Sequence, residues 1–371
     1  MRVVVLGGGA IGASAAFRLA ERGAEVVVVE CHAVAGAASG KSGGFLALDW
    51  CDGTPVEHLA RRSFALHAEF ADIWGGRDWG YRRMTTFSGT VGGSTRHRPQ
   101  ATTPDWVGTD VAIGQRIGTP SSTAQVHPAR FTAATMRAAE THGAILHMGR
   151  ATGLLRRGER VCGVQLEDGT LSADAVVIAM GPWSALASEW LELPPVYGLK
   201  GHSLVFETGT QLPAEALFLD YSDPAGGTLS PEIFPRADGT TYVCGISSET
   251  PVPVDPALIA PDRGALERLA ALCARVSPVL ASAPVVASGA CYRPVTDDGL
   301  PLIGPVGGAD GVFVATGHSV WGILNAPATG ETVAELVLDG TACTIDVSPF
   351  NPARFGRLSR DRVAISRRVG R

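Results

Sequence analysis

The chain has 371 residues, of which 45% are hydrophobic and 18% are charged, and its formal net charge is −5. This balance is typical of globular proteins, and it provides no overall positive field to recruit nucleic acid. The length exceeds the size at which a single core usually keeps growing, so we expect two domains.

The cysteines and histidines show no pattern of metal ligands. The seven cysteines are scattered, odd in number and without a C-x-x-C pair, which favours reduced thiols and no metal site. No apolar run is long enough to span a membrane, and the first residues have the pattern of a strand and a phosphate loop rather than a signal peptide. We therefore expect a cytoplasmic protein.

The first thirty residues have the pattern of one βαβ unit. Residues 3–6 and 26–29 are β-branched apolar runs, typical of strands buried on both faces, and residues 13–22 have helical spacing. A G-x-G-x-x-G motif separates the first strand from the helix, and an acid, Glu30, ends the second strand. This context predicts a dinucleotide site, with a purely structural glycine turn as the alternative.

Each residue of this motif has a physical role in that prediction. Gly7 allows the tight turn, Gly9 lets the backbone approach a pyrophosphate, and Gly12 lets the helix pack closely on the strand. Free amides at the helix start attract the phosphates. Glu30 can accept hydrogen bonds from the ribose hydroxyls, which favours FAD or NAD over NADP.

A second loop, residues 37–48, is rich in small residues and carries Ser39 and Lys41. Its position directly after Glu30 favours a loop that closes over the cofactor, with a flexible connector as the alternative. Further helices are expected at residues 56–74, 129–142, 262–276 and 326–338. Strands are expected within residues 81–123, 144–148, 153–157, 161–166, 175–179, 197–206, 231–245, 289–304 and 312–315.

Four motifs in the same order along the chain give it a family resemblance. They are the G-x-G-x-x-G loop, SGKSGG at residues 39–44, IAMGPWS at residues 178–184, and the pair CYRPVTDDGLPLIGP and ATGHSVWGILNAPATGE at residues 291–305 and 315–331. In these motifs the chain resembles the FAD-dependent oxidoreductases of the D-amino-acid oxidase superfamily, which includes glycine oxidase and sarcosine oxidase. The C-terminal pair is the specific part of the resemblance.

The resemblance implies an α/β fold, with a Rossmann-type FAD-binding domain and a second, mostly antiparallel β-sheet (α+β) substrate domain. The FAD-binding domain is expected to be discontinuous, formed by residues 1–50, 124–190 and 286–345. Residues 51–123 and 191–285 are assigned to the substrate domain, and residues 346–371 to a basic C-terminal tail. Seven arginines and one acid between residues 354 and 371 predict a solvated tail, with an anionic partner as the alternative.

The resemblance also carries individual residues into the predicted site. The expected FAD-binding residues are Gly7, Gly9, Gly12, Glu30, Ser39, Lys41, Gly181, Gly317, Gly322 and Ile323. The helix after residue 322 is expected to aim its positive end at the flavin edge where negative charge collects on reduction. We expect FAD to be bound without a covalent bond, and attachment through Cys291, where sarcosine oxidases carry a flavin-linked cysteine, is the alternative.

Arg293 and His318 are the expected catalytic residues. Arg293 matches the arginine that grips a substrate carboxylate in related oxidases, and the alternative is an ion pair with Asp297 or Asp298. His318 flanks the flavin loop, where it could shuttle a proton or simply pack. The roof segment that supplies substrate selectivity also contains candidates whose orientation the sequence does not determine: Tyr221, Glu232, Arg236 and Tyr242.

The implied function is oxidation of the C–N bond of an amine or amino acid to an imine. Hydride transfer to flavin N5 would be followed by reoxidation by O2, which gives H2O2. Two alternatives remain at this stage: a dehydrogenase of the same fold with another acceptor, and a non-catalytic FAD-binding adaptor. The expected partners are therefore a small amine or amino acid and O2, with no nucleic acid.

Overall fold

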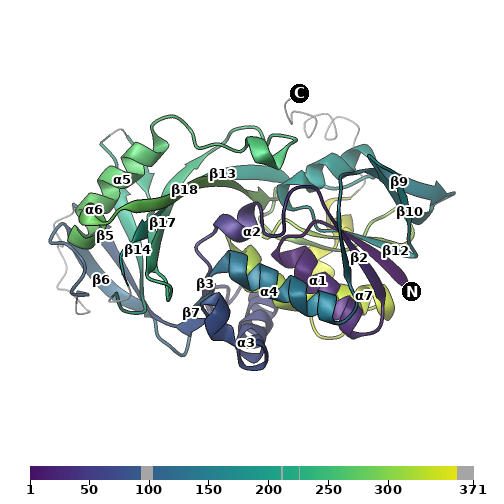
Figure 1. The fold of residues 1–371 in the computed structure, drawn as a ribbon, viewed down its shortest axis with the longest axis horizontal. Helices are drawn as coiled ribbons and strands as arrows, with labels where there is room; N and C mark the ends of the chain where they lie inside the picture. The colour runs from purple at the N-terminus through teal and green to yellow at the C-terminus, as the bar shows by residue number, and fades with distance from the viewer. Residues whose placement is uncertain (93–102, 210–211, 225, 357–371) are drawn as a thin grey trace.

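The computed structural model describes residues 1–92, 103–209, 212–224 and 226–356. Figure 1 shows two bodies side by side, one built on a parallel sheet with packed helices and the other on a large curved sheet, with β13 and β18 running between them. The arginine-rich tail lies almost entirely outside the described residues. No helix in the described ranges is long and apolar enough to cross a membrane.

The first body contains a six-stranded sheet in the order β19-β20-β12-β1-β2-β8. Its strands are parallel except for the β19–β20 pair. Their bounds are β1 Arg2–Leu6, β2 Glu25–Glu30, β8 Ile145–Met148, β12 Ala175–Ile178, β19 Leu302–Pro305 and β20 Val312–Thr316. This order, with β1 in the middle, matches the predicted βαβ start.

Both faces of this sheet are covered, which explains its continuous apolar strands. Val3 and Val5 face one core, and Val4 and Leu6 face another, because successive side chains point to opposite faces. The first core is closed by helices α1 Ala10–Glu21, α3 Glu57–Trp74, α4 Pro128–Thr141 and α7 Gly322–Leu338. The second is closed by the sheet of β9 Ala151–Arg157, β10 Arg160–Leu166 and β11 Thr170–Ser172, and by the 3-10 helix η2 Gly181–Glu189.

The second body is an eight-stranded sheet, here called the roof sheet, in the order β18-β13-β17-β16-β14-β5-β6 with β15 beside β14. All its pairings are antiparallel except β14–β5. The strand bounds are β5 Thr85–Val91, β6 Val111–Gly118, β13 Tyr197–Glu207, β14 Glu215–Ser222, β15 Thr228–Leu229, β16 Glu232–Pro235, β17 Thr240–Ser248 and β18 Val285–Val295.

The roof sheet has one covered face and one face turned toward the first body. Helices α5 Ala265–Val276 and α6 Pro278–Ser282 pack on the outer face, where they bury Ile233 and Val243. A small sheet of β3 Phe45–Ala47, β7 Thr123–Gln125 and β4 Arg82–Arg83 lies between the bodies, with the short helix α2 Ala38–Lys41. The expected α/β class with a second, mostly antiparallel domain is confirmed.

Two segments lie differently from the predicted domain division, whose boundaries remain a prediction. Helix α3 was assigned to the substrate domain, but Leu59, Phe64 and Phe70 pack in the core shared with α1 and α7. Strand β18 was assigned to the FAD-binding domain, yet it pairs along its length with β13 of the roof sheet. Apolar helical spacing shows that a helix is buried, but not which neighbour buries it.

Candidate active site

One cavity of about 670 Å³ lies between the two bodies. On one side it is lined by the loops that follow β1, β2, β8 and β12, here called the floor loops (residues 7–11, 30–39, 149–151 and 179–183). On the other side it is lined by the inner face of the roof sheet. Ligands of open α/β sheets bind outside the carboxyl ends of the strands, which is where this cavity lies.

In the glycine loop, backbone atoms of neighbouring segments lie too close together to leave room for a side chain. Gly7 has φ +108°, and a Cβ added to it would lie 2.4 Å from the carbonyl oxygen of Ala179. A Cβ on Gly12 would lie 1.9 Å from the carbonyl oxygen of Gly7. Gly7 and Gly9 line the cavity, whereas Gly12 lies behind the loop. Gly12 therefore shapes the site through packing.

Glu30 lines the cavity at the end of β2. One carboxylate oxygen accepts from the Gly8 amide and the other from the His32 amide, each at 2.7 Å. An ionised carboxylate has about four lone-pair sites, so two backbone bonds fix its orientation and leave acceptor capacity for a ligand. Glu30 thus combines a structural role with a position suited to ribose hydroxyls.

The SGKSGG loop connects the floor to the roof sheet. Ser39 Oγ accepts from the Ala10 amide at 2.9 Å, at the start of α1. The carbonyl of Lys41 accepts from the Tyr242 hydroxyl at 3.0 Å, and the carbonyl of Ser42 accepts from Arg236 at 3.1 Å. Ser39 lines the cavity, but Lys41 is not among the lining residues, and its side chain lies beside β18 near Gly289.

The roof sheet turns alternate side chains of five strands into the cavity. They are Gly201 on β13, Phe218 on β14, Glu232 and Phe234 on β16, Tyr242, Cys244 and Ser247 on β17, and Cys291 and Arg293 on β18. Neighbours in the ladder share this face: Glu232 lies opposite Cys244, and Phe234 opposite Tyr242. This face of the roof sheet therefore supplies a carboxyl, two thiols, two hydroxyls, a guanidinium and aromatic rings to the same space.

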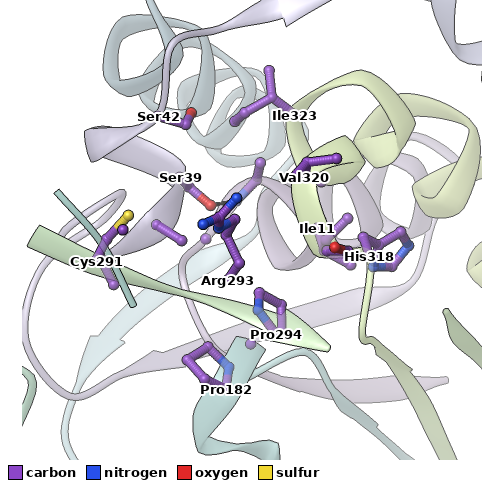
Figure 2. Close-up of a pocket in the computed structure, with 18 of the residues that line it drawn as sticks. Ile11, Ser39, Ser42, Pro182, Cys291, Arg293, Pro294, His318, Val320 and Ile323 are labelled. Atoms are coloured by element: carbon purple, nitrogen blue, oxygen red, sulfur yellow. Dashed lines mark hydrogen bonds between the residues drawn. The ribbon is translucent and has the colours of Figure 1, made fainter. Parts of the chain in front are cut away.

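Arg293 projects from β18 into the cavity (Figure 2). Its guanidinium lies over Gly201, where an added Cβ would lie 3.5 Å from a terminal nitrogen, and it donates to Ser247 Oγ. The absence of a side chain on the neighbouring strand thus gives Arg293 room to lie across β13. The alternative ion pair, with Asp297 or Asp298, is not found among the described residues, and Asp298 instead binds Arg354 at 2.7 Å.

Glu232 is half-buried on the same face. The Cys244 thiol donates to it at 3.6 Å. Burial raises the pKa of Glu232, while Cys244 and the positive charge of Arg293 act in the opposite direction. Of the four roof candidates, Glu232 and Tyr242 line this cavity, whereas Tyr221 packs in the outer core.

Six aromatic side chains line the cavity between the small β3 sheet, the roof sheet and the loop before α7. Ring centroids are 4.9 Å apart for Phe45–Trp50 and Phe45–Phe218, 5.5 Å for Phe45–Phe234, 6.2 Å for Phe234–Tyr242 and 6.4 Å for Trp50–Trp321. Such rings bury large apolar areas and restrict the access of water. This part of the cavity suits an apolar group.

His318 lies at the edge of the cavity with 3% of its surface exposed. Its Nε2 contacts Thr329 Oγ1 at 3.0 Å, and burial lowers its pKa to about 3. The ring is therefore neutral at physiological pH. The next residue, Ser319, lines the cavity with φ +50°, a conformation that is uncommon for a residue with a side chain.

Of the remaining predicted FAD-binding residues, some line the cavity and one does not. Gly181, Gly322 and Ile323 line the cavity, and the carbonyl of Gly181 accepts from Thr316 at 2.9 Å. Gly317 is not among the lining residues. It has φ +78°, and a Cβ there would lie 2.8 Å from the Thr296 side chain, so this glycine serves the turn.

A proline inside α7 is supported by two residues of α3. Pro327 lacks an amide hydrogen, and its ring displaces the carbonyl four residues earlier. His67 Nε2 lies 3.0 Å from the carbonyl oxygen of Ile323 and 3.2 Å from that of Leu324, and Ser63 Oγ accepts from the Ala328 amide at 2.9 Å. These bonds hold the first turn of α7, which faces the cavity.

Sequence reasoning missed Gly201, Ser247 and the aromatic lining. The alternation in residues 231–245 could have placed Glu232, Phe234, Tyr242 and Cys244 on one face, because side chains two apart share a face of a strand. Nothing in the sequence indicates that this face opens on a cavity rather than a core. That information comes from the pairing of strands that are distant in the chain.

The floor fits a dinucleotide. The glycine loop leaves a cradle that side chains would fill. Gly9 precedes α1 and has no side chain to cap the first-turn amides, and Glu30 lies at the end of the next strand. A helix start of this kind binds the phosphates, and the acid binds the ribose. FAD is thus compatible with the residues present, and no metal-binding group of three His, Cys, Asp or Glu occurs in the described ranges.

Comparison with known proteins identifies relatives along nearly the whole chain. A glycine oxidase of Geobacillus kaustophilus is 28% identical over 377 residues, covering 95% of this chain and 96% of the relative. The crystal structure of glycine oxidase from Geobacillus kaustophilus has a TM-score of 0.80 at 26% identity, covering 95% and 99%. A Schizosaccharomyces pombe protein whose name classes it as an oxidoreductase is 27% identical over 378 residues, covering 94% and 97%.

The family described as DAO, FAD dependent oxidoreductase, matches residues 2–336. This range contains the glycine loop, the SGKSGG loop, the inner face of the roof sheet and most of α7. The resemblance inferred from the four motifs is confirmed. Because the match spans most of the chain, the protein belongs to the DAO family and is an FAD-dependent oxidoreductase.

Proposed function

We propose that this oxidoreductase oxidises the C–N bond of an amino acid, or of an amine that carries a carboxylate, to an imine. The observation that carries the proposal is the guanidinium of Arg293, which extends over Gly201 into the cavity and is held by Ser247. Arginine is always charged and presents a planar fork that matches a carboxylate. A fixed arginine in a mostly apolar cavity suits a small anionic substrate.

FAD, when bound, would accept the hydride from the substrate carbon at N5 and would be returned to the oxidised state by O2, with release of H2O2. The chain's own residues would orient the donor and exclude water. Arg293 would fix the carboxylate, and the aromatic rings around Phe45 and Trp50 would cover the apolar part of the substrate. The imine would then hydrolyse in solvent.

In this proposal the residues of the floor loops, together with neighbouring residues on α1, in the SGKSGG loop and at the start of α7, hold the cofactor in two ways. Gly7, Gly9, Ser39, Gly181, Gly322 and Ile323 would lie against it, with Glu30 at the ribose. Gly12 and Gly317 would shape the turns behind those contacts, and Lys41 would act through its loop. The first turn of α7 would place the positive end of that helix beside the flavin, which favours developing negative charge.

We further propose that FAD is held without a covalent bond. Burial raises the pKa of Cys291, so its thiol stays protonated at neutral pH, and the thiolate is the nucleophilic form. His318, being neutral and bonded to Thr329, would position the loop before α7 rather than carry a charge. Acid precipitation should release yellow FAD into the supernatant, whereas colour retained by the pellet and lost in Cys291→Ala would contradict this proposal.

The test of the function is anaerobic mixing with a panel of amino acids and amines while flavin absorbance is recorded. Wild type should be bleached by at least one amino acid, and admission of air should restore the colour and produce H2O2. Restoration only by an added dye or quinone would identify another acceptor. Failure of the whole panel with FAD still bound would favour the non-catalytic alternative.

Arg293→Ala should lower kcat/KM for the amino acid by roughly 30-fold or more. Removal of one partner of a buried charge pair costs about 2–5 kcal/mol, and each 1.4 kcal/mol is about tenfold. Arg293→Lys should recover only part of the activity, because an ammonium cannot form the bidentate fork. The matching amine without its carboxylate is the control. Equal damage to both substrates, or loss of FAD, would make Arg293 structural.

A further inference from the structure

We propose that Glu232 binds the amino group of the substrate and accepts a proton from it, while Arg293 holds the carboxylate, so that the substrate class is zwitterionic α-amino acids with an apolar side chain. This inference rests on the proposed function and names the substrate class of the same site. It is carried by the placement of the two charges on one face of the roof sheet, by the absence of a cation bound to Glu232, and by the aromatic lining.

The register of the roof sheet determines where the Glu232 carboxyl points. Glu232 lies opposite Cys244 on β17 and opposite Phe218 on β14, and all three line the cavity. Ile233, between Glu232 and Phe234, is fully buried in the outer core. Because alternate residues of a strand point to opposite faces, Glu232 must face the cavity.

Glu232 has no cationic partner in the described part of the chain. The ion pairs there, formed at 4.0 Å or closer, do not include it, and its bond is with the weak thiol donor of Cys244. A carboxylate that is removed from water without a cation is costly. A positively charged group on a ligand would remove that cost, and the cavity is where such a group can reach it.

Arg293 and Glu232 reach the cavity from strands that are separated by β13 and β17. Arg293 lies across β13 and donates to Ser247 of β17, which brings its positive charge toward Glu232 without contact. A free α-amino acid carries a carboxylate and an ammonium on the same carbon. Such a ligand would satisfy both side chains at once, whereas a simple amine would leave Arg293 unmatched and a simple acid would leave Glu232 unmatched.

The lining around the two charges is apolar. Phe218 and Phe234 flank Glu232, and Phe45 and Trp50 contact Phe218 at ring-centroid distances of 4.9 and 4.8 Å. A substrate with a hydrogen in place of a side chain would leave this surface uncovered, so leucine- or phenylalanine-like side chains should be favoured over glycine.

The proton transfer itself needs no further reagent, and the hydride transfer that follows needs only the FAD of the proposed function. The substrate ammonium gives one proton to the Glu232 carboxylate, which leaves a neutral amine and a carboxylic acid. The nitrogen lone pair then forms the C=N bond of an iminium ion as the hydride leaves the α-carbon, for which FAD would be the acceptor, and Glu232 later returns its proton to solvent. The raised pKa of Glu232 suits this role, because it brings the group closer to the operating pH.

The experiment compares wild type with Glu232→Gln and the matched control Glu207→Gln, an exposed carboxylate at the end of β13. The probes are both enantiomers of leucine and phenylalanine, glycine, and 3-phenylpropanoate, which has the carboxylate but lacks the amine. Binding of 3-phenylpropanoate is read from the shift of the flavin spectrum, and oxidation from anaerobic bleaching. FAD content is measured for every variant.

With the best amino acid, Glu232→Gln should lower the rate of bleaching about 100-fold, the scale of a lost general base. It should bind 3-phenylpropanoate as tightly as wild type, and its pH profile should lose the limb that reports Glu232. Glu207→Gln should match wild type in all three measurements. In wild type, leucine or phenylalanine should exceed glycine in kcat/KM.

The outcomes separate the inference from the proposed function. If an amino acid bleaches wild type and Glu232→Gln at the same rate, or if both have the same pH profile, the role of Glu232 is wrong while the function stands. If glycine is the best amino acid, the apolar substrate class is wrong. If no amino acid bleaches wild type, the proposed function fails and the inference fails with it.

Discussion

The floor loops and the roof sheet meet the same cavity with different parts of the chain. The floor offers backbone: Gly7 lies against the carbonyl of Ala179, and Gly9 lies directly before the first turn of α1. The roof offers side chains, with Arg293 and Glu232 as its charged groups. A backbone cradle excludes side chains and therefore leaves a glycine spacing in the sequence. A wall of side chains can change its residues and its substrate while the strands stay in place.

The largest effect on folding is expected at Gly12, where the structure has no space for a side chain. A Cβ there would lie 1.9 Å from the carbonyl oxygen of Gly7, so Gly12→Val should prevent α1 from packing on β1 and give little folded protein. At Gly9 the nearest atom to a Cβ, Ser39 Oγ, is 3.1 Å away. Gly9→Val should therefore fold but lose FAD.

The measurements are the melting temperature and the ratio of FAD to protein after purification. Two results would contradict the contrast. One is a Gly12→Val variant that melts as wild type does and is yellow, and the other is a Gly9→Val variant that keeps its full FAD content.

Acid should weaken the first body, where the buried His67 of α3 supports the start of α7, before it weakens the roof sheet. Burial lowers the pKa of His67 to about 4, below the ordinary value of 6.5. Between these values the unfolded chain binds more protons than the folded one, so this contribution to stability is complete above pH 6.5 and is lost as the pH falls toward 4. At about 1.4 kcal/mol per pKa unit, His67 accounts for roughly 3 kcal/mol.

Urea unfolding at pH 7 and pH 4 checks this prediction. His67→Gln keeps an amide that can donate to the carbonyls of Ile323 and Leu324 but does not titrate. The free energy of unfolding of this variant should therefore fall less between the two pH values than that of wild type. The roof pair Lys200–Asp262 should be unaffected in this window, since the pKa of Asp262 is lowered by Lys200 below 3.8. If the free energy of unfolding falls equally between pH 7 and pH 4 in wild type and in His67→Gln, His67 is not the group that titrates.

The smallest effect is expected at a bond that joins the two walls. Tyr242→Phe removes the hydrogen bond from the roof to the carbonyl of Lys41 and should cost about 1 kcal/mol of unfolding free energy, since a neutral hydrogen bond contributes about that much. FAD content should be unchanged, because Arg236 still holds the carbonyl of Ser42. Loss of FAD would mean that the Tyr242 hydrogen bond is needed to hold the SGKSGG loop in its position beside the cofactor.

The same contrast explains what the sequence could predict. Gly7, Gly9 and Glu30 are close in sequence, and their spacing within a strand–helix–strand pattern predicted a dinucleotide site. The family resemblance then indicated that the dinucleotide is FAD. Gly201 and Ser247 became meaningful only after β18, β13 and β17 were paired, because each touches Arg293 from another strand. The predicted clamp at Arg293 was visible as a motif, but its support was not. Contacts between strands that are distant in the sequence produce no local pattern from which they could be predicted.

The packing of α1 on α7 has a consequence for synthesis of the chain. Gly330 on α7 lies so close to Ser14 on α1 that an added Cβ would be 2.4 Å from the Ser14 backbone. Helix α1 therefore packs against a helix, α7, that is synthesised more than three hundred residues later. In a ribosome-bound chain α3 and α4 can cover part of α1 early, but the side of α1 that packs on α7 would stay uncovered throughout that interval. Holdase chaperones should therefore bind the nascent amino-terminal unit until the last helix emerges.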